Sequence, residues 1–580
     1  TPFQFRNFFV KFNASRTMVL KFNKIFSLSI ILVLDAMLFT KNWCMSPIKL
    51  AAFVSAYFAF VLNWAFFRAV FELYQPIGTI SDYFIYTVPI VLWALCYGVF
   101  LLLSIPYLHK VIIPVLLLIS AAISYHSVFF NVYFDKDMLD NVLQTTPAES
   151  IRMISFSYVA WLLFLGVLPT ILYIKVKCTY SIWWQEIIKR IAALMASLVI
   201  IGGTAMIFYQ DYASFFRSHL VVKHLIVPSN FVAASISKIK KMRAANTPYL
   251  AINKDAKLQK TDDKRNVLIF ILGETTRAQN WGLNGYKNQT TPKLAQRIKN
   301  GEAVINFSDV SSCGTATALS VPCLFSDMGR EQYDETRAKS QDNVLDALQY
   351  AGVQVQWIEN NSDCKGVCTH IPTTNTIHLN LPNYCTNGEC LDNIMLPELD
   401  KILDTPSNND LMVVLHTIGS HGPTYFERYT DKERLFTPTC DTQEINRCND
   451  EELRNTYDNS VVYVDQFIDA IITRLQQHQD WKSSVIYASD HGESLGENGI
   501  YLHGTPYAIA PKYQTQIPMV LWLSPTWIEA KGINVDCLQK HHQKPYSHDN
   551  IFHTLIGLSD VNPDTVKNYQ ANLDIIANCH

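Results

Sequence analysis

The sequence predicts an α/β protein in two parts: a five-helix transmembrane domain, followed by a globular domain with a parallel-rich central sheet. Three observations lead to this prediction. Only 17% of the 580 residues are charged, against roughly 25% in typical soluble proteins, and the deficit lies in the first 210 residues. In the second half, apolar strand-like runs alternate with helical stretches. Most of the 13 cysteines also lie in that half.

Five apolar stretches in the first part are long enough to cross a bilayer, which takes about 20 residues. They are Leu50–Phe67, Tyr83–Ile105, Val111–Phe134, Tyr158–Ile174 and Ile191–Tyr209. The alternative is a set of buried helices in a large soluble core. Such helices rarely come as five consecutive stretches this apolar, so we expect membrane spans.

Basic residues between the spans predict the orientation. They gather in the second and fourth connections, as Lys110, Lys175, Lys177, Lys189 and Arg190, whereas the third connection is mostly acidic. Loops rich in lysine and arginine stay in the cytoplasm. With the amino end inside and five crossings, everything after Tyr209 lies on the far side of the membrane.

The cysteines give an independent test of this orientation, because disulfides persist only in oxidising compartments. Ten lie beyond Tyr209: Cys313, Cys323, Cys364, Cys368, Cys385, Cys390, Cys440, Cys448, Cys537 and Cys579. We expect disulfides among them. Zinc binding by several of them is the alternative, but the C-x3-C and C-x4-C spacings lack a matching partner pair. Cys44, Cys96 and Cys178 are expected to be free.

Residues 1–45 form an uncertain amino-terminal extension. Phe26–Thr40 is apolar but only about 15 residues long, short for a span, and contains Asp35. A sixth crossing would also put the cysteine-rich half in the reducing cytosol, so we do not expect a full span. A signal-like segment, an interfacial helix or an extension ahead of a start at Met45 all remain open.

Residues 210–265 are expected to bridge the transmembrane domain, 46–209, and the globular domain, 266–580. The bridge contains the basic run Lys238–Arg243. Such a run suits an amphipathic segment that lies along the lipid headgroups. A solvated linker helix would explain it equally well.

Five strands are predicted in the globular domain: Val267–Gly273, Val353–Ile358, Leu411–Leu415, Val485–Ala488 and Pro518–Leu523. Helical stretches such as Gln341–Gln349 and Val461–Gln477 separate them. This alternation favours a parallel sheet flanked by helices. A glycine-rich phosphate loop and a dinucleotide fingerprint are both missing from the sequence, so a nucleotide mechanism is unsupported.

Two of these strands end in residues that can bind a metal. Val485–Ala488 leads into Ser489-Asp490-His491-Gly492-Glu493, and Val267–Gly273 leads into Glu274. In open α/β sheets the chemistry collects where the strands end. A solvated Asp-His turn is the alternative. The carboxylates and the imidazole together favour zinc, and manganese remains open.

A hydroxyl for nucleophilic attack is offered by Thr315, which follows Ser312-Cys313-Gly314. Ala316–Leu319 is a good helix-forming stretch, so Thr315 is expected near a helix amino terminus, where phosphate is favoured. A divalent metal would make this hydroxyl a better nucleophile. An ordinary helix cap is the alternative.

Three histidines lie near predicted strand ends and add to the case for a site. They are His416, His421 and His503. Each of them could instead be a satisfied structural histidine.

Three motifs resemble those of the lipid A phosphoethanolamine transferases, a family that includes the neisserial-type enzymes and the mobile colistin resistance proteins. They are Gly273-Glu274-Thr275-Thr276-Arg277, Ser312-Cys313-Gly314-Thr315 and the string from Ser489 to Gly499. The resemblance implies an alkaline-phosphatase/sulfatase-like fold, with zinc held by Glu274, Thr315, Asp490 and His491. It makes Thr315 the nucleophile and leaves a second metal open.

The reaction implied by the resemblance has two steps. The threonine takes phosphoethanolamine from phosphatidylethanolamine, releases diacylglycerol, and passes the group to a phosphate of lipid A, which confers resistance to polymyxin. The protein would be a multi-pass protein of the bacterial inner membrane with its catalytic domain in the periplasm. It is expected to be a monomer and to bind no nucleic acid.

Further roles come from the same resemblance. His421 and His503 would bind substrate phosphate or a second metal, and Ser362 and Lys365 would lie near the ethanolamine-phosphate pocket. Asn141, Thr145 and Glu149 would complete the lipid headgroup site from one helical face, although Pro147 could end that helix early. The implied disulfides are Cys313–Cys323, Cys364–Cys368, Cys385–Cys390, Cys440–Cys448 and Cys537–Cys579.

Two other functions compete with this one. A phosphoglycerol transferase or a sulfatase-like membrane hydrolase would share the metal motif, but a sulfatase would need Cys or Ser where Thr315 stands. A non-catalytic membrane receptor with a structural metal would need four firm ligands and no hydroxyl.

Overall fold

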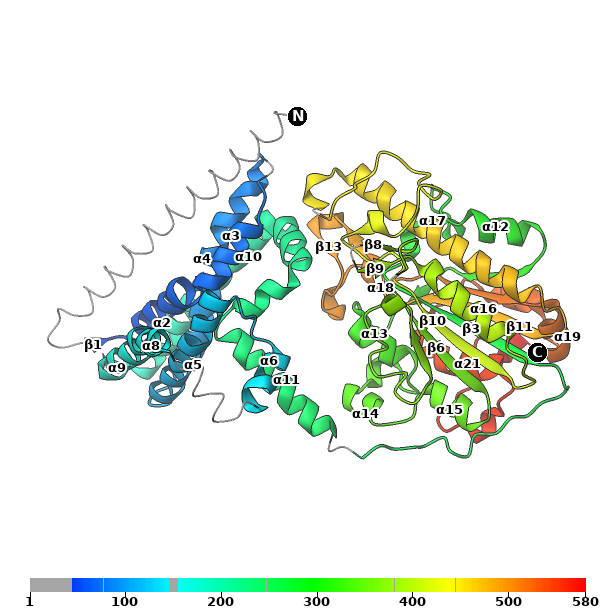
Figure 1. The fold of residues 1–580 in the computed structure, drawn as a ribbon, viewed down its shortest axis with the longest axis horizontal. Helices are drawn as coiled ribbons and strands as arrows, with labels where there is room; N and C mark the ends of the chain where they lie inside the picture. Colours follow the sequence, from blue (N-terminus) through cyan, green and yellow to red (C-terminus); the bar gives the residue numbers. More distant parts are fainter. Residues whose placement is uncertain are drawn as a thin grey trace. The chain divides into compact units, whose positions relative to one another are not determined.

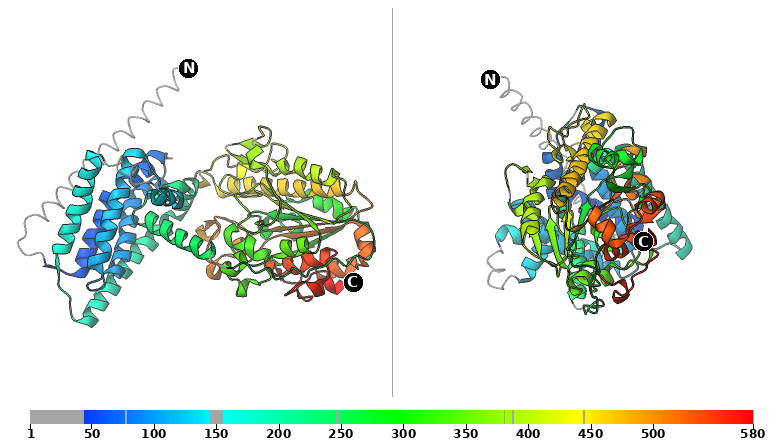
Figure 2. Two further views of the ribbon diagram at one scale, coloured as in Figure 1. Left: turned by 60° about the horizontal axis from the view of Figure 1, so that its bottom comes forward. Right: turned by 90° about the vertical axis from the view of Figure 1, so that its right-hand side faces the viewer.

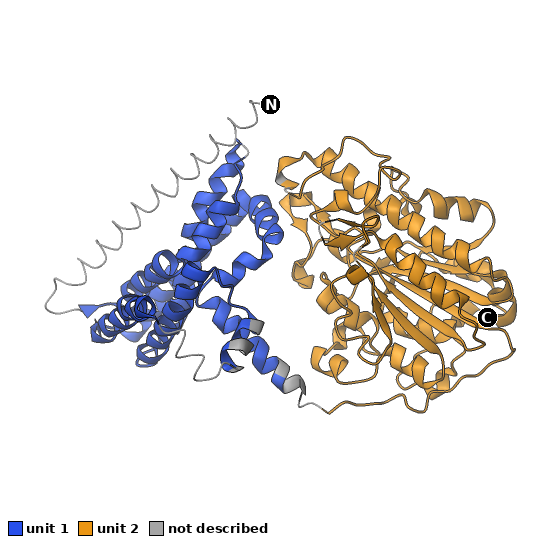
Figure 3. Cartoon of the chain, in the orientation of Figure 1, with its two compact units in different colours: residues 1–243 blue, residues 244–580 orange. Residues whose placement is uncertain are grey.

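The computed structural model describes residues 44–76, 78–144, 155–245, 248–379, 381–386, 388–443 and 445–579. The chain forms two compact units, residues 1–243 and 244–580 (Figure 3). The segment 1–45 falls almost wholly outside the described residues.

The first unit is helical (Figure 1). Its helices are α2 (Pro47–Ala56), α3 (Trp64–Leu73), α4 (Phe84–Leu103), α5 (His109–Phe130), α6 (Lys136–Gln144), α8 (Phe156–Leu162), α9 (Leu168–Lys175), α10 (Trp183–Ser218) and α11 (Ser229–Ala245). Strands β1 (Cys44–Met45) and β2 (Lys177–Cys178) pair in parallel. The π-helical turns Tyr57–Leu62 and Leu163–Val167 join α2 to α3 and α8 to α9.

Four continuous helical segments within the described ranges are long and apolar enough to cross a membrane: Ile80–Leu103, His109–Phe130, Phe156–Lys175 and Trp183–Ser218. A fifth candidate is Pro47–Leu62 with Trp64–Leu73, a pair bent by 54°. All five predicted spans overlap these segments. The last helix is longer than predicted, because it continues past a kink at Phe208 into the proposed bridge.

Part of the proposed bridge packs on the first unit. Phe215, Val222, Leu225 and Ala234 are buried in its hydrophobic core. An interfacial role for the basic run stays a prediction.

The second unit is built on a seven-stranded sheet in the order β4-β14-β11-β3-β10-β6-β7. The strands are β3 (Asn266–Gly273), β4 (Ala303–Phe307), β6 (Gln354–Glu359), β7 (Thr373–Asn375), β10 (Leu411–His416), β11 (Lys482–Ser489) and β14 (Met519–Leu523). From β11 to β7 the neighbours are parallel, whereas β14 runs antiparallel to both β11 and β4. The five predicted strands are all present; β4 and β7 were not predicted.

Helices cover both faces of this sheet (Figure 2). The helices of the second unit are α12 (Pro292–Lys299), α13 (Thr317–Leu324), α14 (Glu335–Lys339), α15 (Val344–Tyr350), α16 (Leu396–Asp404), α17 (Asp450–Leu475), α18 (Lys512–Thr515), α19 (Pro525–Lys531), α20 (Val535–His541) and α21 (Ile551–Leu558). Every residue of β3 is buried, as an apolar run in a central parallel strand requires. Its alternate residues Leu268, Phe270 and Leu272 pack in one core with α13, α15 and α21.

Helix α17 is the longest helix of the second unit and has clear end signals. Asn449 accepts hydrogen bonds from the N–H groups of Glu451 and Glu452, and the Glu452 side chain accepts in return from the N–H of Asn449. Three acidic residues occupy the first turn and Arg474 the last, in agreement with the helix dipole.

Short strand pairs hold the loops around the sheet. They are β5 (Val310–Ser311) with β15 (Tyr546–Ser547), β8 (Cys385–Thr386) with β9 (Glu389–Cys390), and β12 (Ser494–Leu495) with β13 (Tyr501–Leu502).

The second unit contains five disulfides, Cys313–Cys323, Cys364–Cys368, Cys385–Cys390, Cys440–Cys448 and Cys537–Cys579. Cys44, Cys96 and Cys178 are free. Both the pairing and the free cysteines confirm the sequence prediction. Since Cys537 and Cys579 are bonded to each other, their cluster with His541 is not a zinc site.

Candidate active site

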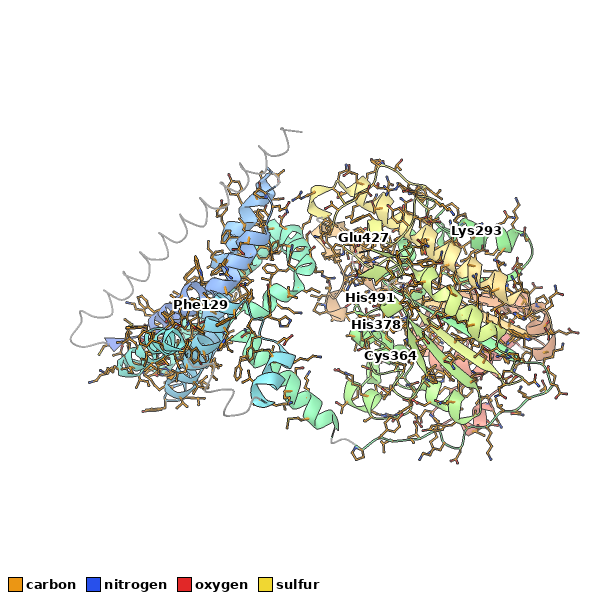
Figure 4. All side chains as sticks on the ribbon, in the orientation of Figure 1. Phe129, Lys293, Cys364, His378, Glu427 and His491 are labelled. Atoms are coloured by element: carbon orange, nitrogen blue, oxygen red, sulfur yellow. A yellow bond between two sulfur atoms is a disulfide. The ribbon has the colours of Figure 1, made fainter. Side chains whose placement is uncertain are left out.

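Glu274 and Asp490 come together because they follow two neighbouring parallel strands. Gly273, the last residue of β3, is in register with Ser489, the last residue of β11. The N–H of Asp490 donates to the Gly273 carbonyl oxygen at 2.8 Å, and both carboxylates are fully buried. His491 follows directly and lies at this end of the sheet (Figure 4).

The turn after Glu274 is strained, and neighbouring groups hold it. Thr275 has φ +49°, a left-handed conformation that β-branched residues rarely adopt. Its N–H donates to Asp490 Oδ1 at 3.1 Å. The Tyr457 hydroxyl, from α17, donates to the Thr275 carbonyl at 2.7 Å and accepts from the N–H of Arg277 at 2.9 Å. The strain therefore aims a backbone donor at the Asp490 carboxylate.

Gly419 makes room for Glu274. It has φ +49°, and a Cβ at this position would lie 2.6 Å from the Glu274 carbonyl oxygen. The next residue, Ser420, donates its N–H to that same oxygen at 3.0 Å. Only glycine permits this approach, so the loop after β10 can close over the acidic residue.

His491 turns one ring nitrogen toward the carboxylates. Its Nδ1 donates to the Gly492 carbonyl at 2.9 Å, which leaves the lone pair on Nε2. Nε2 lies 3.4 Å from Glu274 Oε1 and 3.4 Å from Asp490 Oδ2. One ligand atom from each of these three residues lies within 4.8 Å of the others.

The electrostatics of this group suit a cation. Burial, and secondarily the Asp490 carboxylate, raises the pKa of Glu274 to about 7. Burial also raises the pKa of Asp490 to about 7. Asp490 Oδ2 is buried and has no hydrogen-bond partner among the described residues. Two buried carboxylates that face an imidazole lone pair are stabilised by a metal ion, and this donor set fits zinc.

Thr317, and not Thr315, contacts this group. Thr315 is 6% exposed and its hydroxyl donates to the Thr505 carbonyl at 2.7 Å. The Thr317 hydroxyl lies 3.0 Å from Glu274 Oε2 and 3.5 Å from His491 Nε2. The structure therefore does not bring Thr315 into the contact with Glu274, Asp490 and His491 that the sequence predicted.

The helix start explains the difference between the two threonines. Helix α13 begins at Thr317, with Ala316 as its extended N-cap residue. Thr315 precedes the helix, and its side chain takes another direction. The sequence offers both hydroxyls within two residues of the helix start, and the position of that start decides which of them is in the first turn.

A second group of polar side chains lies beside His491. The His503 ring centroid is 4.5 Å from that of His491 and 5.6 Å from that of His421. His503 Nδ1 lies 3.0 Å from Glu493 Oε2, and Glu493 is fully buried. His503 thus lies next to His491, and His421 lies next to His503, whereas His416 pairs with Glu359 at 2.9 Å.

Ser362 and Lys365 lie on the loop that follows β6. Lys365 Nζ donates to Ser362 Oγ at 2.6 Å. Asn361, which sequence reasoning missed, donates from Nδ2 to Glu274 Oε2 at 2.8 Å and to the Thr417 carbonyl at 2.9 Å. The first part of this loop therefore contacts Glu274 through Asn361.

The predicted headgroup residues are not tested by the structure. Asn141 lies in α6, but its side chain is outside the described set, as are Thr145 and Glu149 altogether.

The fold and this site define a class of protein. A mixed sheet carries two carboxylates and an imidazole at its strand ends, beside a hydroxyl on a helix amino terminus; this arrangement is the sulfatase or alkaline-phosphatase type. The family model described as sulfatase matches residues 266–561. The model described as phosphoethanolamine transferase EptA/EptB matches residues 92–242.

Similar proteins narrow the class. The chain is 43% identical over 538 residues to phosphoethanolamine transferase EptA of Escherichia coli (strain K12), covering 91% of this chain and 96% of that one. It is 37% identical over 544 residues to phosphatidylethanolamine transferase Mcr-1 of Escherichia coli, covering 91% and 97%.

A solved structure agrees with these relatives. It is the integral membrane protein lipooligosaccharide phosphoethanolamine transferase A (EptA) from Neisseria meningitidis, with a TM-score of 0.62, 51% identity, and coverage of 93% of this chain and 100% of that chain. The chain therefore belongs to the EptA/Mcr family of phosphoethanolamine transferases. The predicted family and fold class are both confirmed.

Proposed function

We propose that this protein transfers phosphoethanolamine from phosphatidylethanolamine to a phosphate of lipid A and thereby confers polymyxin resistance. The names of its relatives support this substrate pair. Mcr-1 is named a phosphatidylethanolamine transferase, and a relative that is 28% identical is named Kdo(2)-lipid A phosphoethanolamine 7''-transferase. The observation that carries the proposal is the Thr317 hydroxyl, 3.0 Å from Glu274 Oε2 in the buried carboxylate and imidazole group.

Thr317 replaces Thr315 as the proposed nucleophile. In the first step its oxygen forms a bond to phosphorus, the bond from phosphorus to the glycerol oxygen breaks, and diacylglycerol leaves with a proton. In the second step an oxygen of a lipid A phosphate forms a bond to phosphorus, the bond from phosphorus to the Thr317 oxygen breaks, and that oxygen takes the acceptor's proton to restore the hydroxyl. Attachment to a helix fixes the same oxygen for both displacements.

Glu274, Asp490 and His491 would hold one zinc ion, with the Thr317 oxygen beside it. When bound, such an ion would lower the pKa of the hydroxyl and offset negative charge on the phosphoryl oxygens. The Nδ1 bond of His491 to Gly492 holds its ring in the ligand orientation.

His421 and His503 are proposed to bind phosphate or a second metal, because His503 lies beside His491 and His421 lies beside His503. Ser362 and Lys365 are proposed to contact the phosphoethanolamine headgroup, because their loop starts at Asn361. The roles of Asn141, Thr145 and Glu149 remain predictions.

The proposed location is the bacterial inner membrane, with residues 210–265 as the bridge to a periplasmic catalytic domain. Four or five candidate spans, the basic connections and the five disulfides support it. A monomer remains the expected state.

Mass spectrometry of lipid A tests the function and the nucleophile together. Cells that express the wild type should gain one phosphoethanolamine on lipid A, and cells with Thr317→Ala should not. Thr315→Ala is the matched control and should retain transfer, because its hydroxyl bonds to Thr505. Loss of transfer in Thr315→Ala with normal transfer in Thr317→Ala would reverse the assignment. A phosphoglycerol adduct in the wild type would favour the rival transferase.

A further inference from the structure

Two segments must stay in register for the proposed reaction. One is the loop Ser312–Ala316, which leads into Thr317, and the other is the end of β11, which leads into Asp490 and His491. We propose that His548 is a positioning residue that fixes this register by bonding to the backbone of both segments. The inference rests on the proposed function, since it concerns how the nucleophile meets its metal group.

The His548 ring is 1% exposed and both its nitrogens are used. Nδ1 accepts from the N–H of Cys313 at 3.0 Å, and Nε2 donates to the Ser489 carbonyl at 2.9 Å. A backbone N–H can only donate and a carbonyl can only accept, so these partners fix one neutral tautomer. The ring is thus a rigid spacer between the nucleophile loop and the residue before Asp490.

The chain around His548 is built to hold the ring in place. Strand β15 pairs in parallel with β5, so that Ser547 lies opposite Ser311, one residue before the loop. The Ser547 side chain accepts from the N–H of Asp549, and the Asn550 side chain accepts from the N–H of Ser547. These bonds close a capping box around His548, and the buried helix α21 follows.

Ser489 also connects His548 to the segment that follows Glu274. Its hydroxyl accepts from the N–H of Thr276 at 2.8 Å, two residues after Glu274. His548 therefore bonds to Ser489, which directly precedes Asp490 in the chain and also holds the segment after Glu274.

Other hydrogen bonds from the loop run to a different segment. The Ser312 N–H donates to the Thr515 carbonyl, the Thr315 carbonyl accepts from the N–H of Gly504, and the Tyr507 hydroxyl donates to the Ser312 carbonyl. They hold the loop to residues 504–515, which reach the segment after β11 only through a further bond, from the N–H of Gly492 to the Gln514 carbonyl. His548 supplies a direct link without touching the reacting atoms.

Two substitutions separate the halves of the link. In His548→Asn the amide oxygen takes the place of Nδ1 and keeps the bond from Cys313, but the side chain is too short for Ser489. In His548→Gln the amide nitrogen takes the place of Nε2 and keeps the bond to Ser489, but Cys313 loses its acceptor. Each variant therefore keeps the hydrogen bond to one segment and loses the hydrogen bond to the other.

The test measures kcat and KM for the full-length protein in detergent micelles, with phosphatidylethanolamine as donor and lipid A as acceptor. Bound zinc and the thermal midpoint are measured on the same samples. Both variants should lose about tenfold or more in kcat, because a small misplacement of a nucleophile is costly. KM and bound zinc should stay close to the wild-type values.

His553→Asn is the matched control. His553 is also buried, lies on α21 and accepts a backbone N–H bond, from Gln570 at 3.1 Å, but it does not bond to the loop or to β11. This variant should lower the thermal midpoint and leave kcat unchanged. The milder variant Asn550→Ala, which opens the capping box, should lower kcat by a smaller factor and serves if the His548 variants do not fold.

The outcomes separate the two proposals. If the wild type transfers nothing, the proposed function fails. If the wild type is active and the folded His548 variants keep wild-type kcat, the positioning role is overturned. It is also overturned if they lose zinc, if they lose kcat only in proportion to the midpoint as His553→Asn does, or if Asn550→Ala keeps full kcat when the His548 variants are unfolded.

Discussion

The stabilisation expected from the proposed zinc ion should increase steeply with pH. Burial raises the pKa of Glu274 from 4.5 to about 7 and that of Asp490 from 3.8 to about 7. Without metal, the folded protein holds protons on these carboxyls that the unfolded chain has already lost. The metal-free protein therefore loses stability as pH rises from about 4 to 7.

The size of the effect follows from those pKa values. Moving one carboxyl pKa from 4.5 to about 7 corresponds to about 3 kcal/mol of lost stability once the group is ionised in the metal-free fold. The Asp490 carboxylate itself contributes to the raised pKa of Glu274, so the losses of the two groups cannot be added in full. Roughly 3–5 kcal/mol of lost stability is expected for the pair. A bound cation replaces the protons and removes the loss.

The assay is the thermal unfolding of the second unit in the full-length protein, stripped of metal or loaded with zinc, between pH 5 and 8. Asp465 lies away from the metal group, on α17, where it caps α12, and burial raises its pKa to about 7 as well. Its contribution is the same in both samples and cancels in the difference between them. A zinc-induced rise in midpoint that stayed flat over this range would refute the reasoning, and so would an unaltered pH dependence in Glu274→Gln.

Three further predictions concern the support of the site. Gly419→Ala should cost about 1–3 kcal/mol and weaken zinc binding, since its Cβ would lie 2.6 Å from the Glu274 carbonyl; unchanged zinc affinity by titration would contradict this. Tyr457→Phe should cost about 1–3 kcal/mol in chemical unfolding, because it leaves the buried Thr275 carbonyl and Arg277 N–H without their partner; a cost confined to Tyr425→Phe, its ring neighbour, would argue against it. Non-reducing mass spectrometry should recover all five bridges beyond Tyr209, and free thiols throughout would overturn the periplasmic placement.

Sequence reasoning predicted that Glu274, Asp490 and His491 meet, and the structure brings them together. Two apolar runs in a parallel sheet place Glu274 and Asp490 at one edge whatever the loops do. The strands β4 and β7 were missed, because they lie at the edges and their residues are less apolar than those of β3. Loop residues that bond to these side chains, such as Asn361, could not be predicted from the sequence, because their contacts depend on the packing of segments far apart in the chain.

The choice between Thr315 and Thr317 shows where such reasoning loses precision. Both lie within two residues of the start of α13, and helix boundaries inferred from sequence are uncertain by about that much. A shift of two residues turns a side chain by more than half a helical turn. The motif was therefore located correctly while the residue that faces Glu274 was not.

In the proposed mechanism the Thr317 oxygen serves two successive displacements, and the same loop is built to hold that oxygen in place. The Cys313–Cys323 disulfide ties the start of the loop to α13 itself, so the helix cannot unwind freely from its first turn. The His548 bond fixes the N–H of Cys313 against β11. Cys313 is thus held both by its side chain and by its backbone, four residues before the nucleophile. Under the proposed function, Thr317 would accept phosphoethanolamine, wait for a second lipid and release the group again, so it would gain more from this rigidity than the nucleophile of a hydrolase that reacts with water at once.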